Sequence, residues 1–172
     1  STPKYNLIYN AFEWEIPRYI HCPPVMKDEH NKLSKRNGDA SFQDLVAKGY
    51  LPGAILNYIA LLGWSPEEDK EIFTLDELVQ AFNVKHIGKV GAIFDPDKLK
   101  WINGMWLRGM DLDSYYDLVK PYIDQAVKGD FDGKKIAAIL QQRAETLVEI
   151  PGMLDFFDEF PAYDNALYVN KK

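Results

Sequence analysis

The sequence predicts a mainly α-helical protein with one small β-hairpin and a basic loop near its N-terminal end. Apolar residues recur at helical spacing along most of the 172-residue chain. Two Ser/Thr-x-x-Asp/Glu patterns, at residues 41–44 and 74–77, mark helix starts, because their side chains can satisfy free backbone N–H groups. The Asn37-Gly38 pair favours a tight turn just after the hairpin.

The first 40 residues are expected to hold one helix, one short strand and the hairpin. Ser1, Thr2 and Pro3 form a helix start, since a hydroxyl residue can cap the first turn and proline fits within it. Pro17 ends this helix by residue 16 at the latest. Residues 19–22 form a short strand-like run that two prolines stop. The hairpin and the basic loop follow.

Four helices are expected between residues 41 and 110. Their starts are marked by capping residues or by proline at the first turn, and Gly49 and Gly63 stop the first two. The expected ranges are 41–48, 52–63, 74–82 and 95–107. Trp101, Ile102, Met105 and Trp106 are expected along one side of the last helix.

The remaining residues predict two further helical stretches and a tail. Asp111 begins the first stretch, Pro121 is expected to break or restart it, and Gly129 closes it. The longest helical pattern opens at residue 132 and stops at Pro151. The aromatic-rich tail, residues 153–172, is expected to pack back onto that helix. A soft boundary falls at 108–111.

The residues that suggest chemistry lie in the loop after the hairpin. Lys32, Lys35 and Arg36 place three cations within five residues, with Leu33 and Ser34 among them. Such a loop suits a polyphosphate, because attack on the α-phosphate of ATP builds negative charge on the phosphoryl oxygens and on the departing pyrophosphate. Lysine is a mobile point charge that can favour the transition state over the ground state. Taken alone, the motif is more typical of a solvated surface loop than of a phosphate-binding one.

Residues 32–36, Lys-Leu-Ser-Lys-Arg, resemble the second signature of class I aminoacyl-tRNA synthetases. The general form is Lys-Met-Ser-Lys-Ser, and the form seen here is the usual variant in glutamyl-tRNA synthetases. Flanking blocks resemble bacterial members of that family in the same order, so the resemblance covers essentially the whole chain. These blocks are residues 1–4, 12–15, 48–52, 61–65 and 94–99.

The resemblance assigns roles to the loop residues by position. Lys35 would contact the ATP phosphates and stabilise the transition state, with Lys32 assisting. Ser34 would hold the loop, and Leu33 belongs to the same ATP-binding stretch. Arg36 stands where the general motif has serine, so its role in binding the phosphates is less defined.

The resemblance also implies a piece of a glutamate–tRNA ligase. The intact enzyme would use ATP and Mg²⁺ to convert glutamate to glutamyl-adenylate, and would transfer it to tRNA(Glu). Residues 1–40 would end a class I catalytic domain, 41–110 would form an α-helical stem-contact module, and 111–172 would form the first anticodon-binding helical domain. The His-Ile-Gly-His signature and the glutamate and adenine sites are expected upstream, and a second anticodon-binding domain downstream. The piece alone should therefore be inactive.

Bulk composition is that of an ordinary globular protein, at 47% hydrophobic and 27% charged residues. No apolar run approaches the roughly 18 residues of a membrane span, and no secretory leader is visible. The single cysteine, Cys22, fits a reducing compartment, so a cytoplasmic monomer without membrane contact is expected. The net charge of −6 argues mildly against a nucleic-acid binder, although a local basic face can serve that role in an acidic chain.

Two alternatives stay open. The chain could be a non-catalytic helical module that binds tRNA or a protein, with the basic loop as a passenger. It could also come from a glutaminyl-tRNA synthetase, although bacterial enzymes of that type follow the signature with β-barrels, which the helix signals oppose. The sequence does not determine whether the parent enzyme charges only tRNA for glutamate or also tRNA for glutamine.

Other candidate residues have plainer interpretations. Residues 86–89 match His-Ile-Gly-His for three positions but follow the basic loop, so a connector turn is expected there. His21, Cys22 and His30 fit no common zinc spacing, and no metal site is expected. Several basic residues suit either a solvated helix face or tRNA phosphate contacts: Lys89, Lys98, Lys100, Arg108, Lys134, Lys135 and Arg143. Trp and Phe residues are expected in the core rather than as base-stacking platforms.

Overall fold

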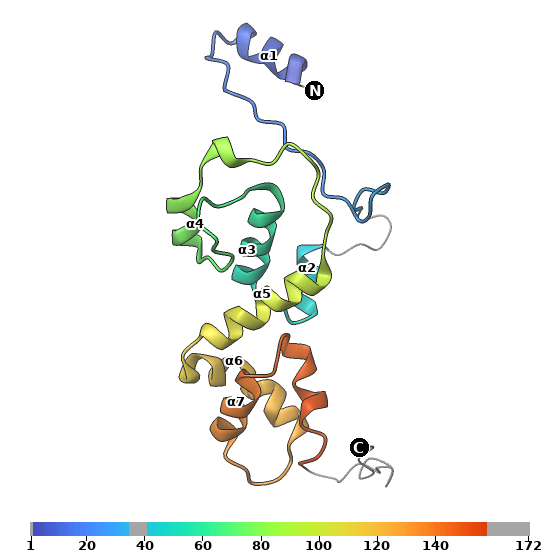
Figure 1. The fold of residues 1–172 in the computed structure, drawn as a ribbon, viewed down its shortest axis with the longest axis vertical. Coiled ribbons are helices and arrows are strands. Elements are labelled where there is room, and N and C mark those ends of the chain that lie inside the picture. Colours follow the sequence, from blue (N-terminus) through green and yellow to red (C-terminus); the bar gives the residue numbers. More distant parts are fainter. Residues whose placement is uncertain (1, 35–40, 158–172) are drawn as a thin grey trace.

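The computed structural model describes residues 2–34 and 41–157 of the chain. It confirms a mainly α-helical fold, elongated, with α1 at one end and the α6–α7 pair at the other (Figure 1). No helix in the described ranges is both long and apolar enough to cross a bilayer. The α-helices are α1 (Thr2–Ala11), α2 (Phe42–Ala47), α3 (Pro52–Gly63), α4 (Leu75–Ala81), α5 (Pro96–Gly109), α6 (Leu112–Ala126) and α7 (Gly133–Gln141), and the short 3₁₀ helices are η2 (Val84–His86), η3 (Leu147–Glu149) and η4 (Pro151–Met153).

The N-terminal segment stands apart from the rest of the molecule (Figure 1). Helix α1 buries none of its residues, and Leu7 is 69% exposed. The strand expected at residues 19–22 is wrong: this stretch is exposed and carries no strand pairing. A strand is defined by hydrogen bonds to a neighbour, and none of the described residues offers one there.

A middle module, residues 41–109, packs α2, α3, α4 and α5 around two apolar clusters. Both predicted capping boxes are confirmed, because Ser41 accepts from the Asp44 N–H and Thr74 accepts from the Glu77 N–H. Helices α3 and α5 pack against each other, and their buried faces supply most of the larger cluster. The larger cluster is Leu45, Ala54, Ile55, Tyr58, Leu99 and Ile102, and the smaller is Trp64, Phe73 and Leu78.

The four residues expected along one side of α5 differ in burial. Ile102 is fully buried and Trp106 packs partly against the core, whereas Trp101 and Met105 are 40% and 37% exposed. Trp101 and Met105 are four residues apart, so they lie next to each other at the exposed edge of this side of the helix.

A C-terminal module, residues 111–157, packs α6 against α7 and the two following 3₁₀ helices. The expected break at Pro121 is wrong, because α6 continues through it. Proline removes one backbone hydrogen bond, and the apolar face of α6 compensates by packing on α7. The buried cluster is Leu107, Tyr115, Val119, Ile123, Ile136, Ala137, Leu140, Ala144, Leu147, Ile150 and Leu154.

The expected longest helix is also wrong, since α7 ends at Gln141 rather than continuing to Pro151. The N–H groups of Arg143 and Ala144 both donate to Leu140 O, which tightens and ends the helix. The tail then lies beside α7 up to Phe157, whose ring meets that of Phe131 at 5.1 Å between centroids. Residues 158–172 lie outside the described residues.

Candidate functional site

The predicted hairpin is present and is very short. Met26 and Lys32 form an antiparallel bridge. The Leu33 N–H donates to Val25 O at 3.0 Å, and the Lys27 N–H donates to Asn31 O at 2.8 Å. The arms therefore deliver Lys32 to the point where the basic loop begins.

Asp28 closes the tip of the hairpin. Its Oδ1 accepts from the backbone N–H groups of His30 and Asn31, both at 2.9 Å, and from Asn31 Nδ2 at 3.0 Å. This Asx-type turn is the reason that the polar run 28–31 folds as a tip. The hydrogen bond from the Asn31 side chain, followed by the backbone donors, lowers the pKa of Asp28 below its usual value.

The hairpin is anchored to the segment that leads into α5. The Met26 N–H donates to Ala92 O at 2.9 Å, and the Phe94 N–H donates to Met26 O at 2.8 Å. A Cβ at Gly91 would lie 2.7 Å from Pro24 O, so only glycine allows this close approach. The base of the basic loop is thereby held against the middle module.

The structure describes only part of the predicted site. Lys32 is exposed, and Leu33 and Ser34 are half-buried where the chain leaves the hairpin. No carboxylate among residues 2–34 and 41–157 forms an ion pair with Lys32. Lys35 and Arg36 lie outside the described residues.

The described residues of the predicted site are cationic or neutral. An exposed lysine on an anchored hairpin, without an ion pair to any described residue, can bind an anion. In residues 2–34 and 41–157, no three His, Cys, Asp or Glu side chains group so as to hold a metal ion.

The connector expected at residues 86–89 is confirmed. His86 ends η2, and its carbonyl accepts from the Ser65 N–H at 3.2 Å. The Gly88 N–H donates to Gly63 O at 2.9 Å, which joins the connector to the end of α3. Cys22 is a free, exposed thiol.

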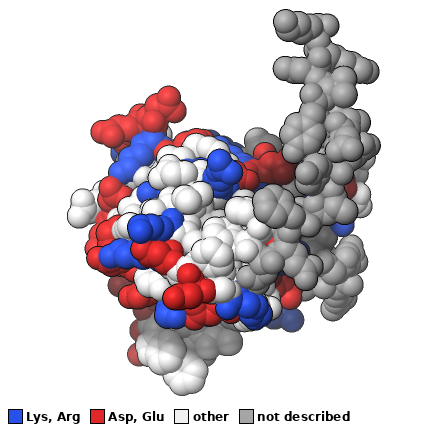
Figure 2. All heavy atoms as spheres, turned by 90° about the horizontal axis from the view of Figure 1, so that it is seen from below, with Lys and Arg blue, Asp and Glu red and all other residues white. Residues whose placement is uncertain are grey.

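The basic residues that could lie on a solvated face or contact tRNA phosphates divide into those that form ion pairs and those that do not. On the face at the α6–α7 end, Lys and Arg are interspersed with Asp and Glu (Figure 2). Lys134 pairs with Asp113, and Lys135 with Asp132 at 3.2 Å. Lys98 pairs with Glu71 at 2.5 Å and Lys100 with Glu149 at 2.5 Å. Within the described part of the chain, Lys89, Arg108 and Arg143 form no ion pair.

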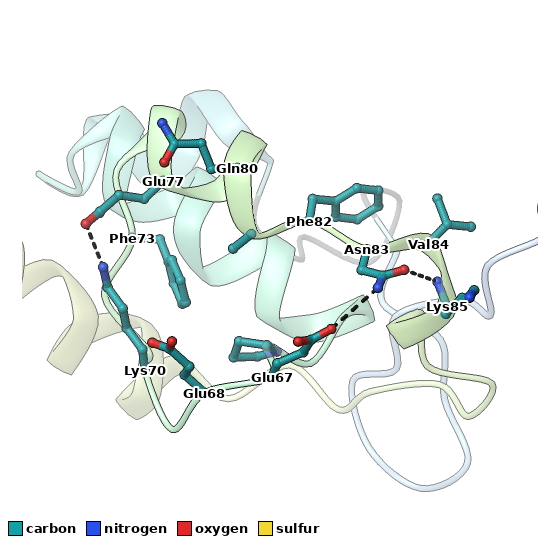
Figure 3. A pocket seen from close by; sticks show the side chains of 12 residues that line it. Glu67, Glu68, Lys70, Phe73, Glu77, Gln80, Phe82, Asn83, Val84 and Lys85 are labelled. Atoms are coloured by element: carbon teal, nitrogen blue, oxygen red, sulfur yellow. Dashed lines mark hydrogen bonds and ion pairs between the residues drawn. The ribbon is translucent and has the colours of Figure 1, made fainter.

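The sequence did not indicate an open groove of about 1000 Å³ between the 66–73 loop, α4 and η2 (Figure 3). Lys70 donates to Glu77 at 2.6 Å and lies 4.9 Å from the centre of the Phe73 ring. That hydrogen bond, with the Thr74 N–H, lowers the pKa of Glu77 to about 2. Of the features that form this groove, the sequence indicated only the capping box at Thr74. Side chains of both charges line the groove beside Phe73 and Phe82.

Comparison with known proteins shows the family to which the chain belongs. A sequence profile described as "tRNA synthetases class I (E and Q), catalytic domain" matches residues 1–101. The chain belongs to this family. A second profile, "Anticodon binding domain", matches residues 114–172 of the same synthetase chain.

Curated relatives extend the match over the whole synthetase chain. A protein named glutamate–tRNA ligase from Clostridium botulinum strain Hall is 55% identical over 172 residues, and one of the same name from Clostridium kluyveri is 57% identical. Both alignments cover 100% of the chain but only 36% and 35% of the relatives. The chain thus spans about a third of the length of these proteins.

Solved structures agree with the fold. The crystal structure of a glutamate–tRNA synthetase from Elizabethkingia anophelis gives a TM-score of 0.79 at 28% identity, over 96% of the chain and 38% of that protein. A glutamate–tRNA ligase from Elizabethkingia meningosepticum, solved with its amino acid, gives 0.75 at 28% identity, over 89% of the chain and 34% of that protein.

Proposed function

We propose that the chain is part of a glutamate–tRNA ligase, an enzyme that joins glutamate to tRNA(Glu) at the expense of ATP. The observation that carries the proposal is the 55–57% identity to proteins of that name over the full length of the chain. In this proposal residues 32–36 bind the ATP phosphates, and the helices from 41 onward form part of the tRNA-binding surface.

The role of the basic loop is supported by how it is held. A group that stabilises developing phosphate charge works best when it is already positioned and costs little to reorganise. The backbone bonds of Met26 to Ala92 and Phe94 fix the start of the loop, and exposed Lys32 forms no ion pair with a carboxylate of the described residues. Lys35 would supply the main charge at the transition state, with Lys32 and Arg36 beside it.

The proposed modules are residues 1–40 as the end of the catalytic domain, 41–110 as a stem-contact module, and 111–172 as the first anticodon-binding domain. One of the two largest apolar clusters lies within residues 45–102, and the other lies beyond residue 110 except for Leu107 of α5. The family profiles leave residues 102–113 unmatched, around the same boundary.

The setting proposed for the parent enzyme is a cytoplasmic monomer. The exposed free thiol of Cys22 suits a reducing compartment. ATP, glutamate and tRNA(Glu) are its proposed substrates, with Mg²⁺ brought in by ATP.

The test is Lys35→Ala in the full-length ligase. We expect kcat/KM for glutamylation of tRNA(Glu) to fall by about 100-fold or more, since a charge that acts mainly in the transition state is lost. The affinity for tRNA, measured by filter binding, should stay close to that of the unchanged enzyme. Lys48→Ala, an exposed lysine of the middle module, serves as the matched control.

Unchanged kinetics combined with weakened tRNA binding would contradict the catalytic role of the loop. That result would favour a helical tRNA-binding module in which residues 32–36 are a passenger. Charging of tRNA with glutamine rather than glutamate by the full-length protein would overturn the proposed amino acid.

A further inference from the structure

The groove between the 66–73 loop, α4 and η2 shares no residue with the predicted phosphate site (Figure 3). Its volume of about 1000 Å³ lies at the upper end of the range for small-molecule pockets, and it is open to solvent. A groove of this size and openness suits a stretch of polypeptide better than an enclosed metabolite.

Aromatic rings form one wall of the groove and are supported from behind. Phe82 and Val84 line the groove and are each 52% exposed, so both offer apolar surface to a ligand. Trp64 is only 4% exposed, and its ring centroid lies 5.9 Å from those of Phe73 and Phe82. Because Trp64 and Phe73 are buried, the wall is preformed and needs little reordering when a side chain packs on it.

Lys70 and Glu77 form an ion pair at one end of the groove. Lys70 Nζ donates to Glu77 Oε1 at 2.6 Å and lies 4.9 Å from the centre of the Phe73 ring. The ammonium is thus held by a carboxylate and by an aromatic face. Each of these two charges already has its partner within the groove.

Glu67 and Glu68 rise from the 66–73 loop toward α4 and lack a close cationic partner (Figure 3). Glu67 Oε1 lies 3.5 Å from Asn83 Nδ2 and 3.6 Å from His86 Nε2, and both distances are long for a hydrogen bond. Glu68 forms no ion pair with any residue of 2–34 or 41–157. Two adjacent carboxylates beside exposed apolar side chains therefore face the groove, opposed by the single ammonium of Lys85, which likewise forms no ion pair in those ranges.

This combination favours a protein segment and disfavours a nucleic acid. Glu67 and Glu68 would repel a phosphate backbone, whereas an arginine or lysine would form charge-assisted hydrogen bonds with them. An aromatic or branched apolar side chain next to that cation would pack on Phe82 and Val84. Arginine and aromatic side chains are the residues that most often dominate the affinity of protein interfaces.

We propose that the groove is a docking site for a segment of a partner protein that carries an arginine or lysine next to a large apolar residue. The cation would lie between Glu67 and Glu68, and the apolar side chain would cover Phe82 and Val84. The surface is separate from the residues proposed to bind ATP and from the basic residues considered for tRNA. The inference therefore does not depend on the proposed ligase function.

The experiment selects peptides on the full-length protein. A phage-displayed library of random dodecapeptides is panned against the immobilised protein, and the enriched peptides are synthesised with a fluorescein label. Fluorescence anisotropy gives their Kd for the unchanged protein, for Glu67→Gln/Glu68→Gln and for Phe82→Ser. Asp130→Asn/Asp155→Asn removes two exposed carboxylates of the C-terminal module and is the matched control for charge.

We expect the enriched peptides to carry an arginine or lysine close to an aromatic or branched apolar residue. Both groove variants should raise the Kd by about tenfold or more, the loss typical of a residue that dominates an interface. The control should leave the Kd within about twofold, because distant exposed charges are screened by salt. Excess tRNA(Glu) should not displace the peptides.

The inference is overturned if no peptide is enriched, because another part of the full-length protein would then cover the groove. It is also overturned if the enriched peptides bind the groove variants as tightly as the unchanged protein. Displacement by tRNA(Glu) would assign the groove to an RNA surface, and self-association that Phe82→Ser abolishes in analytical ultracentrifugation would make a second copy the occupant. If circular dichroism shows that Phe82→Ser does not fold, Val84→Ser, at an equally exposed position, takes its place.

Discussion

At the scale of single residues, buried asparagines organise the middle module. Asn57 is 0% exposed. Its Oδ1 accepts from the Phe73 N–H at 3.0 Å and from Trp106 Nε1 at 3.1 Å, while its Nδ2 donates to Glu71 O at 2.9 Å. One amide thus joins α3, the 66–73 loop and α5. No hydrophobic pattern reveals such a residue, because its partners are distant in the sequence.

We predict that Asn57→Ala destabilises the chain by about 3 kcal/mol, because it leaves a carbonyl and two N–H groups buried without partners. Urea unfolding followed by tryptophan fluorescence measures the change in the free energy of unfolding. Gln43→Ala, which truncates an exposed amide on α2, should change it by less than about 0.5 kcal/mol. A similar small change for Asn57→Ala would show that water replaces the lost bonds.

At the scale of elements, packing rather than local propensity decides where helices continue and end. Helix α6 contains Pro121 and still runs over 15 residues. Its buried face, Tyr115, Val119 and Ile123, packs on α7 and holds the helix together across the missing hydrogen bond. Helix α7 ends earlier than its pattern suggests, because the following turn bonds to Gly49 and Asn103 of the other module.

We predict that Pro121→Ala stabilises the chain by about 1–3 kcal/mol, since it restores a backbone donor within an established helix. Thermal unfolding followed by circular dichroism would show a higher midpoint. The matched control is Gln125→Ala, an exposed position of the same helix that already donates its N–H, and its effect should be a few tenths of a kcal/mol. A lower midpoint for Pro121→Ala would mean that the proline fits a local distortion of α6.

At the scale of the whole molecule, the net charge is −6, but the basic residues differ in whether a carboxylate pairs with them. On the C-terminal module, Lys134 is engaged by Asp113, whereas Arg143 is exposed and has no ion pair within the described residues. A cation already paired with a carboxylate gains less from a phosphate than an unpaired one. The unpaired cations are therefore the better candidates for tRNA contact.

We predict that the chain binds tRNA(Glu) with a log–log salt dependence that reflects several phosphate contacts, and that Arg143→Gln lowers the magnitude of its slope by about 1. Lys134→Gln, the paired counterpart on α7 of the same module, should leave the slope unchanged. Fluorescence anisotropy from low to moderate salt gives both slopes. Equal losses for the two variants would show that local pairing does not select the tRNA contacts, and no binding at low salt would place the tRNA surface outside this chain.

The sequence by itself determined the features that depend on neighbouring residues. The capping boxes at Ser41 and Thr74, the stops at Gly49 and Gly63, and the turn that Asp28 closes all follow from bonds formed within a few positions. The signature at residues 32–36 is likewise contiguous and could be identified directly. The roles of Lys35 and Arg36 in phosphate binding remain a prediction, since both residues lie outside the described residues.

Only the tertiary structure decided what depends on partners far along the chain. The run at residues 19–22 is not a strand, because pairing needs a neighbour that the described chain does not supply there. Residues 133–150 do not form one helix, because bonds from Glu145 and Leu147 to the middle module outweigh helical propensity. The hydrogen bonds of Asn103 have the same origin. Its side chain accepts from the Leu51 N–H and donates to Glu145 O, 52 and 42 positions away, and no local pattern encodes those separations.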